Sequence, residues 1–136
     1  MAAFMLSSTY IALSGVDYSQ YAHAVTLTVD VNDLDTTDFA SAGWKDVIGG
    51  LKSGMLDVEW NQDVAVSTLD SALWALLGTV VTFEVRATSA VVGTSNPKYT
   101  GSVLINGWTP FDGNVGDLAQ VSSSFPVSGA VTRATS

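Results

Sequence analysis

The 136-residue chain carries 13 acidic and 5 basic side chains, a net charge of −8, and charged residues make up 13% of it. A chain this acidic repels nucleic-acid phosphates, which excludes a DNA-binding domain that grips its ligand with basic residues. The length suits one domain, no apolar run is long enough for a membrane helix, and the lack of cysteine excludes a disulfide framework. Because so few charges cover the apolar sequence, we expect part of the surface to be buried by self-association.

Two strands are predicted near the start, and the second alternates apolar and polar residues, as strands buried on one side do. Residues 10–13 predict a short first strand, and residues 23–31 predict a longer second strand. The apolar face of the second strand is expected to point into the core, and it consists of Val25, Leu27, Val29 and Val31.

Residues 32–50 have no sustained period, and Gly43 and the Gly49-Gly50 pair predict turns. We therefore expect a long loop, and a loop of this length inside a compact domain usually has a function. The apolar side chains that it offers for burial, for example against another subunit, are Trp44, Val47, Ile48 and Leu51.

Oxygen-bearing side chains gather around the start of this loop, and calcium prefers such ligands. They are Asp30, Asn32, Asp33, Asp35 and Asp38. The spacing lacks the glycine and the final glutamate of an EF-hand, so a solvated, turn-forming acidic loop is the interpretation we prefer. Calorimetry on calcium addition would decide between the two.

Two further strands are predicted on either side of the middle of the chain. In residues 55–62 the apolar face holds Leu56, Val58 and Trp60, and the polar face holds Asp57, Glu59 and Asn61. In residues 81–86 the apolar face holds Val81, Phe83 and Val85, and the polar face holds Thr82, Glu84 and Arg86.

A short helix is predicted between these two strands. Ser67 is expected to cap its free amides, with Asp70 three residues later as in a capping box. Gly78 is expected to end it in the left-handed conformation. The apolar stripe of the helix consists of Leu69, Ala72, Leu73, Leu76 and Leu77.

The last third predicts strands at residues 99–108 and 119–127 and a short strand at 130–133, with an Asp-Gly turn inside 109–114. Pro126 confines its strand end to a sheet edge or a bulge. The sum is an all-β fold, a sandwich or barrel of about seven strands with one helix packed on it.

Catalysis finds little support in the residues. The one histidine, His23, stands at the start of a strand, and general acid–base catalysis needs an oriented partner. We find no nucleophile elbow, phosphate loop or zinc motif, and we expect no enzyme activity, no cofactor and no metal site. Trp60 and Trp74 are expected in the core or at an interface, and Trp44 and Trp108 leave a sugar platform as an alternative.

The polar faces of three predicted strands offer a surface of threonine and carboxylate, if those strands are neighbours. Its acidic members are Asp30, Asp57, Glu59 and Glu84, and its threonines are Thr26, Thr28 and Thr82. Such a surface is either an ordinary solvent face or a wall along which a polyanion moves without binding, because like charge repels phosphates.

Six stretches, in this order, resemble the major tail protein (tail tube protein) family of long-tailed bacteriophages of actinobacterial type. They are residues 34–37 (LDTT), 50–54 (GLKSG), 56–63 (LDVEWNQD), 76–86 (LLGTVVTFEVR), 96–101 (NPKYTG) and 128–134 (SGAVTRA). No single stretch is diagnostic, and their joint order carries the resemblance.

The resemblance implies a β-sandwich with a flanking helix, whose copies form hexameric rings in which one sheet per subunit closes a continuous barrel. Rings would stack into a tail tube around the tape-measure protein, with tail terminator and baseplate proteins as further partners. Genomic DNA would later pass through without specific binding. The location would be the virion tail, assembled in the host cytoplasm without a membrane, and residues 1–136 would be a single tube domain without the surface domain that many members append.

The resemblance also implies where the contacts lie. The acidic wall of Asp30, Asp57, Glu59 and Glu84 would face the lumen. The loop 32–50 would mediate contacts between subunits and rings, with the N-terminus as a second candidate, and its expected contact residues are Asp33, Asp35, Asp38, Trp44, Val47 and Ile48. The alternatives are another virion protein, such as a head–tail connector or capsid decoration protein, and a secreted carbohydrate-binding module.

Overall fold

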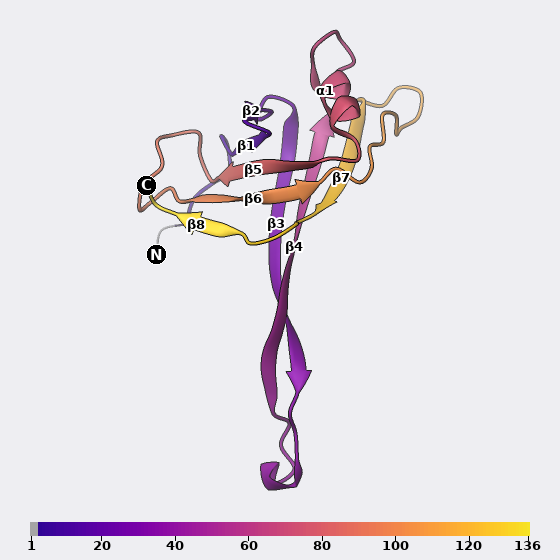
Figure 1. The fold of residues 1–136 in the computed structure, drawn as a ribbon. Coiled ribbons are helices and arrows are strands. Elements are labelled where there is room, and N and C mark those ends of the chain that lie inside the picture. The colour runs from indigo at the N-terminus through magenta and orange to yellow at the C-terminus, as the bar shows by residue number, and fades with distance from the viewer. Residues whose placement is uncertain (1–2) are drawn as a thin grey trace.

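The computed structural model describes residues 3–136, which form two antiparallel sheets and one α-helix (Figure 1). The five-stranded sheet has the order β2-β1-β5-β6-β8, and the three-stranded sheet has the order β3-β4-β7. The strands are β1 (Tyr10–Leu13), β2 (Val16–Asp17), β3 (Ala22–Asp35), β4 (Val47–Asn61), β5 (Val80–Arg86), β6 (Lys98–Leu104), β7 (Gln120–Pro126) and β8 (Thr132–Ala134), and the helices are α1 (Leu69–Leu76) and the 3-10 helix η1 (Phe39–Ser41). The predicted all-β class with one α-helix is confirmed; the strand added to the prediction is the two-residue β2.

The core lies where the two sheets cross. Its buried side chains include Leu56, Val58, Trp60, Val81 and Phe83 from the predicted apolar faces. Ile11, Leu13, Val103, Val121 and Phe125, from the other predicted strands, are buried with them. Trp60 is fully buried, and its Nε1 donates a hydrogen bond to Ser123 Oγ at 2.7 Å, which satisfies the one polar group of its ring. Period-two alternation thus identified core residues in both sheets.

Helix α1 closes one end of this core with two fully buried leucines, Leu69 and Leu73. The prediction of Ser67 as the cap is wrong. Thr68 occupies the cap position, Ser67 has φ +61°, and Asp70 instead accepts a hydrogen bond from Trp108 Nε1 at 2.9 Å. The tertiary contact with Trp108 therefore uses the carboxylate that local spacing assigned to a capping box.

Two predictions about chain breaks are confirmed. Gly78 has φ +84° after the helix, and its amide donates to the Ile105 carbonyl at 2.7 Å. Pro126 ends β7, which is an edge strand of the three-stranded sheet. Beyond it, the Ser128 amide donates to the Ser102 carbonyl at 2.8 Å, so the chain passes from one sheet to the other at this corner.

Strands β3 and β4 continue far beyond the core as a two-stranded hairpin that projects from the body (Figure 1). Strand β7 pairs with β4 only from Met55 to Asn61, so residues 30–53 have no third strand beside them. We call residues 30–53 the arm. The predicted loop 32–50 is therefore wrong at its two ends, because residues 32–35 belong to β3 and residues 47–50 to β4, whereas residues 36–46 lie outside strands.

The strand ends of the arm were predicted as loop because the pairing register of the arm is irregular. Pairing shifts between Val31 and Asp33, which breaks the alternation that a sequence pattern needs. Gly50 lies inside β4 and not in a turn. A glycine suits this position because a Cβ would lie 3.1 Å from the Asn32 carbonyl oxygen of the paired strand. Val29 and Val31, expected in the core, are 50% and 51% exposed because no second layer covers this part of the hairpin.

Candidate assembly surfaces

The arm presents apolar side chains to solvent on both of its faces. They are Val31, Leu34, Phe39, Trp44, Val47, Ile48 and Leu51, of which Leu51 is 85% exposed. A two-stranded hairpin without a packing layer is marginally stable in water, and an apolar surface of this kind marks an interaction site. The arm is therefore a candidate surface for contact with another chain. Of the residues predicted for subunit contacts, all six lie on it: Asp33, Asp35, Asp38, Trp44, Val47 and Ile48.

The tip of the arm, residues 36–46, is held by its own hydrogen bonds. Asp38 accepts from the Ala40 amide at 3.0 Å and completes a capping box with Ser41 around η1. Asp46 accepts from Ser41 Oγ at 2.6 Å, and the Asp46 amide donates to Thr37 Oγ1 at 2.8 Å. The tip is thus an ordered turn that exposes Phe39 and Trp44, and sequence reasoning had not singled out Phe39.

Asp35 at the base of the tip is exposed and ionised. The side chain of Thr37, and then its backbone amide, lower the pKa of this carboxyl by hydrogen bonding to the charged form. The Thr37 amide lies 2.9 Å from Asp35 Oδ1. Because the acids of the tip serve local hydrogen bonds, the acidic loop has a structural explanation of its own. Residues 3–136 place no group of three or more histidine and acidic side chains where it could hold a metal ion.

The outer face of the three-stranded sheet carries the polar residues of three strands, as its register shows. Thr26, Asp57 and Ser124 are opposite one another, and Ala24, Glu59 and Ser122 form the next row. Ser124 Oγ donates a short hydrogen bond to Asp57. We call Thr26, Thr28, Asp57, Glu59, Ser122 and Ser124 the polar sheet face. It is a surface of hydroxyls with two carboxylates.

Two acids predicted for this wall lie elsewhere. Asp30 is opposite Ser53 on the arm, beyond the part of the sheet that β7 covers. Glu84 belongs to β5 in the five-stranded sheet, where its Oε2 lies 2.9 Å from Arg86 Nε. The three strands with polar faces were expected to be neighbours in one sheet. This is wrong for β5, which pairs with β1 and β6.

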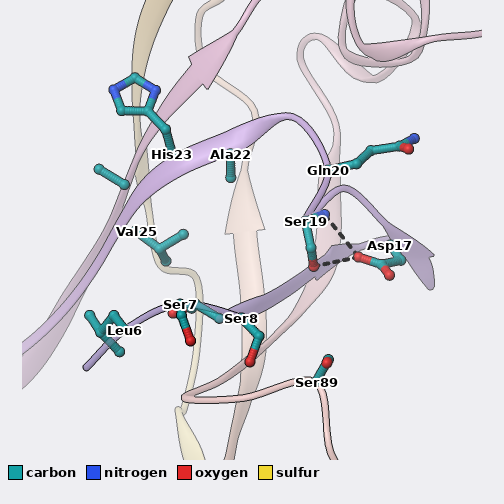
Figure 2. A pocket seen from close by; sticks show the side chains of 12 residues that line it. Leu6, Ser7, Ser8, Asp17, Ser19, Gln20, Ala22, His23, Val25 and Ser89 are labelled. Atoms are coloured by element: carbon teal, nitrogen blue, oxygen red, sulfur yellow. Dashed lines mark hydrogen bonds between the residues drawn. The ribbon is translucent and has the colours of Figure 1, made fainter. Parts of the chain in front are cut away.

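The single histidine lies at the rim of the polar sheet face. His23 Nε2 is 3.4 Å from Glu59 Oε2, and both side chains are substantially exposed. A hollow of about 490 Å³ opens between the start of β3 and the N-terminal residues 6–9 (Figure 2). Figure 2 shows Asp17 and Ser19 at one end of it, joined by hydrogen bonds, and His23 turned away at the other. These side chains do not converge on one point, so the hollow offers no catalytic arrangement.

The two tryptophans of the sugar-platform alternative lie on different parts of the molecule. Trp44 is exposed at the tip of the arm, whereas Trp108 packs against the core and is bonded to Asp70 of α1. They therefore do not form one stacking surface. No helix among residues 3–136 has the length and apolar character that crossing a membrane requires.

No protein-family model and no curated protein matches this sequence. Among solved structures, the chain is similar to one from a structure described as "Virion of native gene transfer agent (GTA) particle", with a TM-score of 0.66 and 17% sequence identity. The similarity covers 83% of this chain and 84% of that chain. At this level of identity the comparison shows a shared fold: two antiparallel sheets with one helix.

Proposed function

We propose that this chain is a structural virion protein of a phage-like particle, whose copies assemble into rings that stack into a tail tube. The observation that carries the proposal is the arm, an ordered hairpin with seven uncovered large apolar side chains on a fold shared with a virion chain. Burying such side chains is worth about 1.5–3 kcal/mol each, so the arm provides enough contact energy for assembly.

A second copy of the chain is the partner that the arm fits best in this proposal. In the ring that we propose, the arm of one copy contacts a different surface of the next copy, so the contact is heterologous. Repeated heterologous contacts close into rings or continue as stacks. We assign the contacts between subunits and rings to the arm, and the exposed Phe4, Met5 and Leu6 near the N-terminus are a second candidate.

The lumen is assigned to the polar sheet face. Asp57 and Glu59 repel phosphates, and the neighbouring serines and threonines offer no cationic foothold, so DNA would pass without binding. Glu84 is not included, because its sheet is the other one. The tape-measure protein inside the tube, and tail terminator and baseplate proteins at its ends, are the further partners that this proposal requires.

Negative-stain electron microscopy of the concentrated full chain, together with size-exclusion chromatography, tests the proposal. Rings or tubes with a central hole are the expected result. Monomers alone at the highest attainable concentration would overturn it.

A head–tail connector or a capsid decoration protein is the second candidate. It is supported by the same similarity, since the description of the neighbouring structure names the whole virion and no part of it. Single rings, or particles that bind only to capsids, would favour this candidate over stacked tubes.

A further inference from the structure

Strand β4 has an unpaired edge along the arm. Its neighbour β7 ends at Pro126, and the last bond on that side runs from the Val127 amide to the Gly54 carbonyl at 3.0 Å. Backbone groups of a strand in an antiparallel sheet point alternately to its two edges, so β4 continues to direct amides and carbonyls to this side beyond Gly54. Among residues 3–136, no strand pairs with them there. We call residues 47–53 of β4 the open edge.

The open edge lacks the devices that protect other strand edges. A row of free amides and carbonyls is a template for another strand, and natural proteins blunt it with charges or prolines. The open edge, with the sequence VIGGLKS, has one charged residue, Lys52. The other edge of the arm, on β3, has three acids, Asp30, Asp33 and Asp35. An added strand is therefore expected on β4 and not on β3.

Apolar side chains lie beside the open edge on both faces of the arm. Leu34 and Ile48 are paired and lie on one face. A Cβ at Gly50 would meet Leu34, whereas a Cβ at Gly49 would meet Val31, so the two glycines and the two apolar side chains belong to opposite faces. The glycines also leave room for large side chains of an added strand, and an aromatic residue beside an edge glycine stabilises a sheet.

Residues 3–8, which we call the N-terminal segment, have the side chains that such a position requires. All six residues are exposed, and none forms a backbone hydrogen bond within the described part of the chain. Phe4, Met5 and Leu6 are 69%, 80% and 64% exposed. Because side chains alternate along a strand, Phe4 and Leu6 would lie on one face and Met5 on the other. The segment is thus apolar on both faces, as the arm is.

Charge distinguishes this segment from the other exposed apolar regions among residues 3–136. The first charged residue of the chain is Asp17, so the N-terminal segment is neutral. Residues 63–80 and 111–118 also expose several large apolar side chains. Their acidic residues are Asp63, Asp70, Asp112 and Asp117. The arm carries five aspartates against two lysines, so it repels these two regions and a second arm, but not a neutral strand.

We propose that the N-terminal segment of one copy adds a strand to the open edge of another copy, antiparallel to β4 and in line with β7. This inference rests on the proposed function and names the two segments that meet. In the register that puts Met5 opposite Gly49, Phe4 lies opposite Gly50 and Leu6 opposite Ile48. The hairpin thereby gains a third strand along the arm, which an isolated two-stranded hairpin needs for stability in water.

Disulfide trapping tests the contact directly, because the chain has no cysteine of its own. Leu6→Cys/Ile48→Cys places two thiols opposite each other on neighbouring strands. Under oxidation this variant is expected to give a ladder of cross-linked copies on a non-reducing gel.

The matched control is Leu6→Cys/Leu34→Cys, which moves the second thiol to the residue of β3 that is paired with Ile48. Its Cα lies one strand further from the added strand, roughly 9–10 Å away, beyond the about 7 Å that a disulfide spans between Cα atoms. No ladder is expected. A ladder in the control alone would place the added strand on β3 and overturn the proposal.

Added charge gives an independent measurement. Phe4→Asp/Leu6→Asp is expected to raise the concentration needed for assembly by about tenfold or more, because it removes two buried apolar contacts and adds like charge to an acidic arm. Thr94→Asp/Ser95→Asp adds the same charge on an exposed turn and is expected to assemble at nearly the wild-type concentration. Circular dichroism checks the folding of both variants. Equal losses in both would make net charge the cause and overturn the contact.

The trapping outcomes separate the two proposals. Wild-type rings or tubes with no Leu6→Cys/Ile48→Cys ladder would overturn the strand addition and leave the proposed function standing. A wild-type chain that forms no assemblies would overturn both. A cross-link confined to single chains, visible as a monomer band of altered mobility, would show that the segment pairs with its own arm and would overturn the contact between copies.

Discussion

Truncation of two leucines of strand β4 should affect two different properties, the stability of the subunit and its assembly. Leu51 on the arm is 85% exposed, and Leu56, five residues along the same strand, is fully buried in the core. Leu56→Ala is expected to lower the free energy of unfolding of the subunit by about 2–5 kcal/mol, the range for truncation of a buried leucine. Leu51→Ala is expected to change it by less than about 0.5 kcal/mol, as for other surface substitutions.

Assembly, in contrast to subunit stability, should be sensitive to truncation of Leu51 on the arm. If another copy covers Leu51, its truncation removes about 1.5–3 kcal/mol per contact, and since about 1.4 kcal/mol is tenfold in affinity, the concentration needed for assembly rises roughly 10- to 100-fold. Urea unfolding of dilute subunits measures the first effect, and light scattering with negative-stain images measures the second. A Leu51→Ala variant that assembles like the wild type would refute the reasoning that the arm is an interface.

Two further predictions concern single charged groups. Glu84→Gln is expected to destabilise the subunit by about 1–3 kcal/mol, because it leaves the mostly buried Arg86 without its carboxylate, whereas Glu59→Gln on the polar sheet face is expected to be nearly neutral. Thermal unfolding of the two variants compares them, and equal shifts would contradict the sheet assignment of these acids. The pKa of Asp35 is lowered in the folded chain, so its stabilising contribution is present above its unfolded pKa and is lost as the pH falls through the folded value. Thr37→Val is expected to raise the pKa of Asp35 toward its ordinary value, as an NMR titration of the carboxyl would show; an unchanged titration would exclude Thr37 as the cause.

The polar sheet face illustrates how far local patterns reach. Alternation correctly assigned Asp57 and Glu59 to the face opposite Leu56 and Trp60, because side-chain direction in a strand is fixed by its period of two. The same pattern could not say which strands are neighbours. Glu84 has the same local signature, yet it lies in the other sheet.

The arm shows a different limit of prediction from sequence. Its register shift removes the regular period, and its two faces are both exposed, so burial imposes no pattern on residues 30–53. Gly43 lies in the turn that it predicted, at φ +85°, whereas Gly49 and Gly50 lie inside β4, where the strands approach closely, as the tight contact at Gly50 shows.

The sequence alone determined the all-β class, the core faces of the strands and the position of α1, because each of these follows from the periodicity with which apolar side chains are buried. Only the tertiary structure decided that β5 lies in a different sheet from Asp57 and Glu59, and that β3 and β4 extend into both ends of the expected loop as a projecting hairpin. The physical reason is that strand pairing is made by hydrogen bonds between segments distant in the chain, and no local pattern of residues specifies the partner of such a bond.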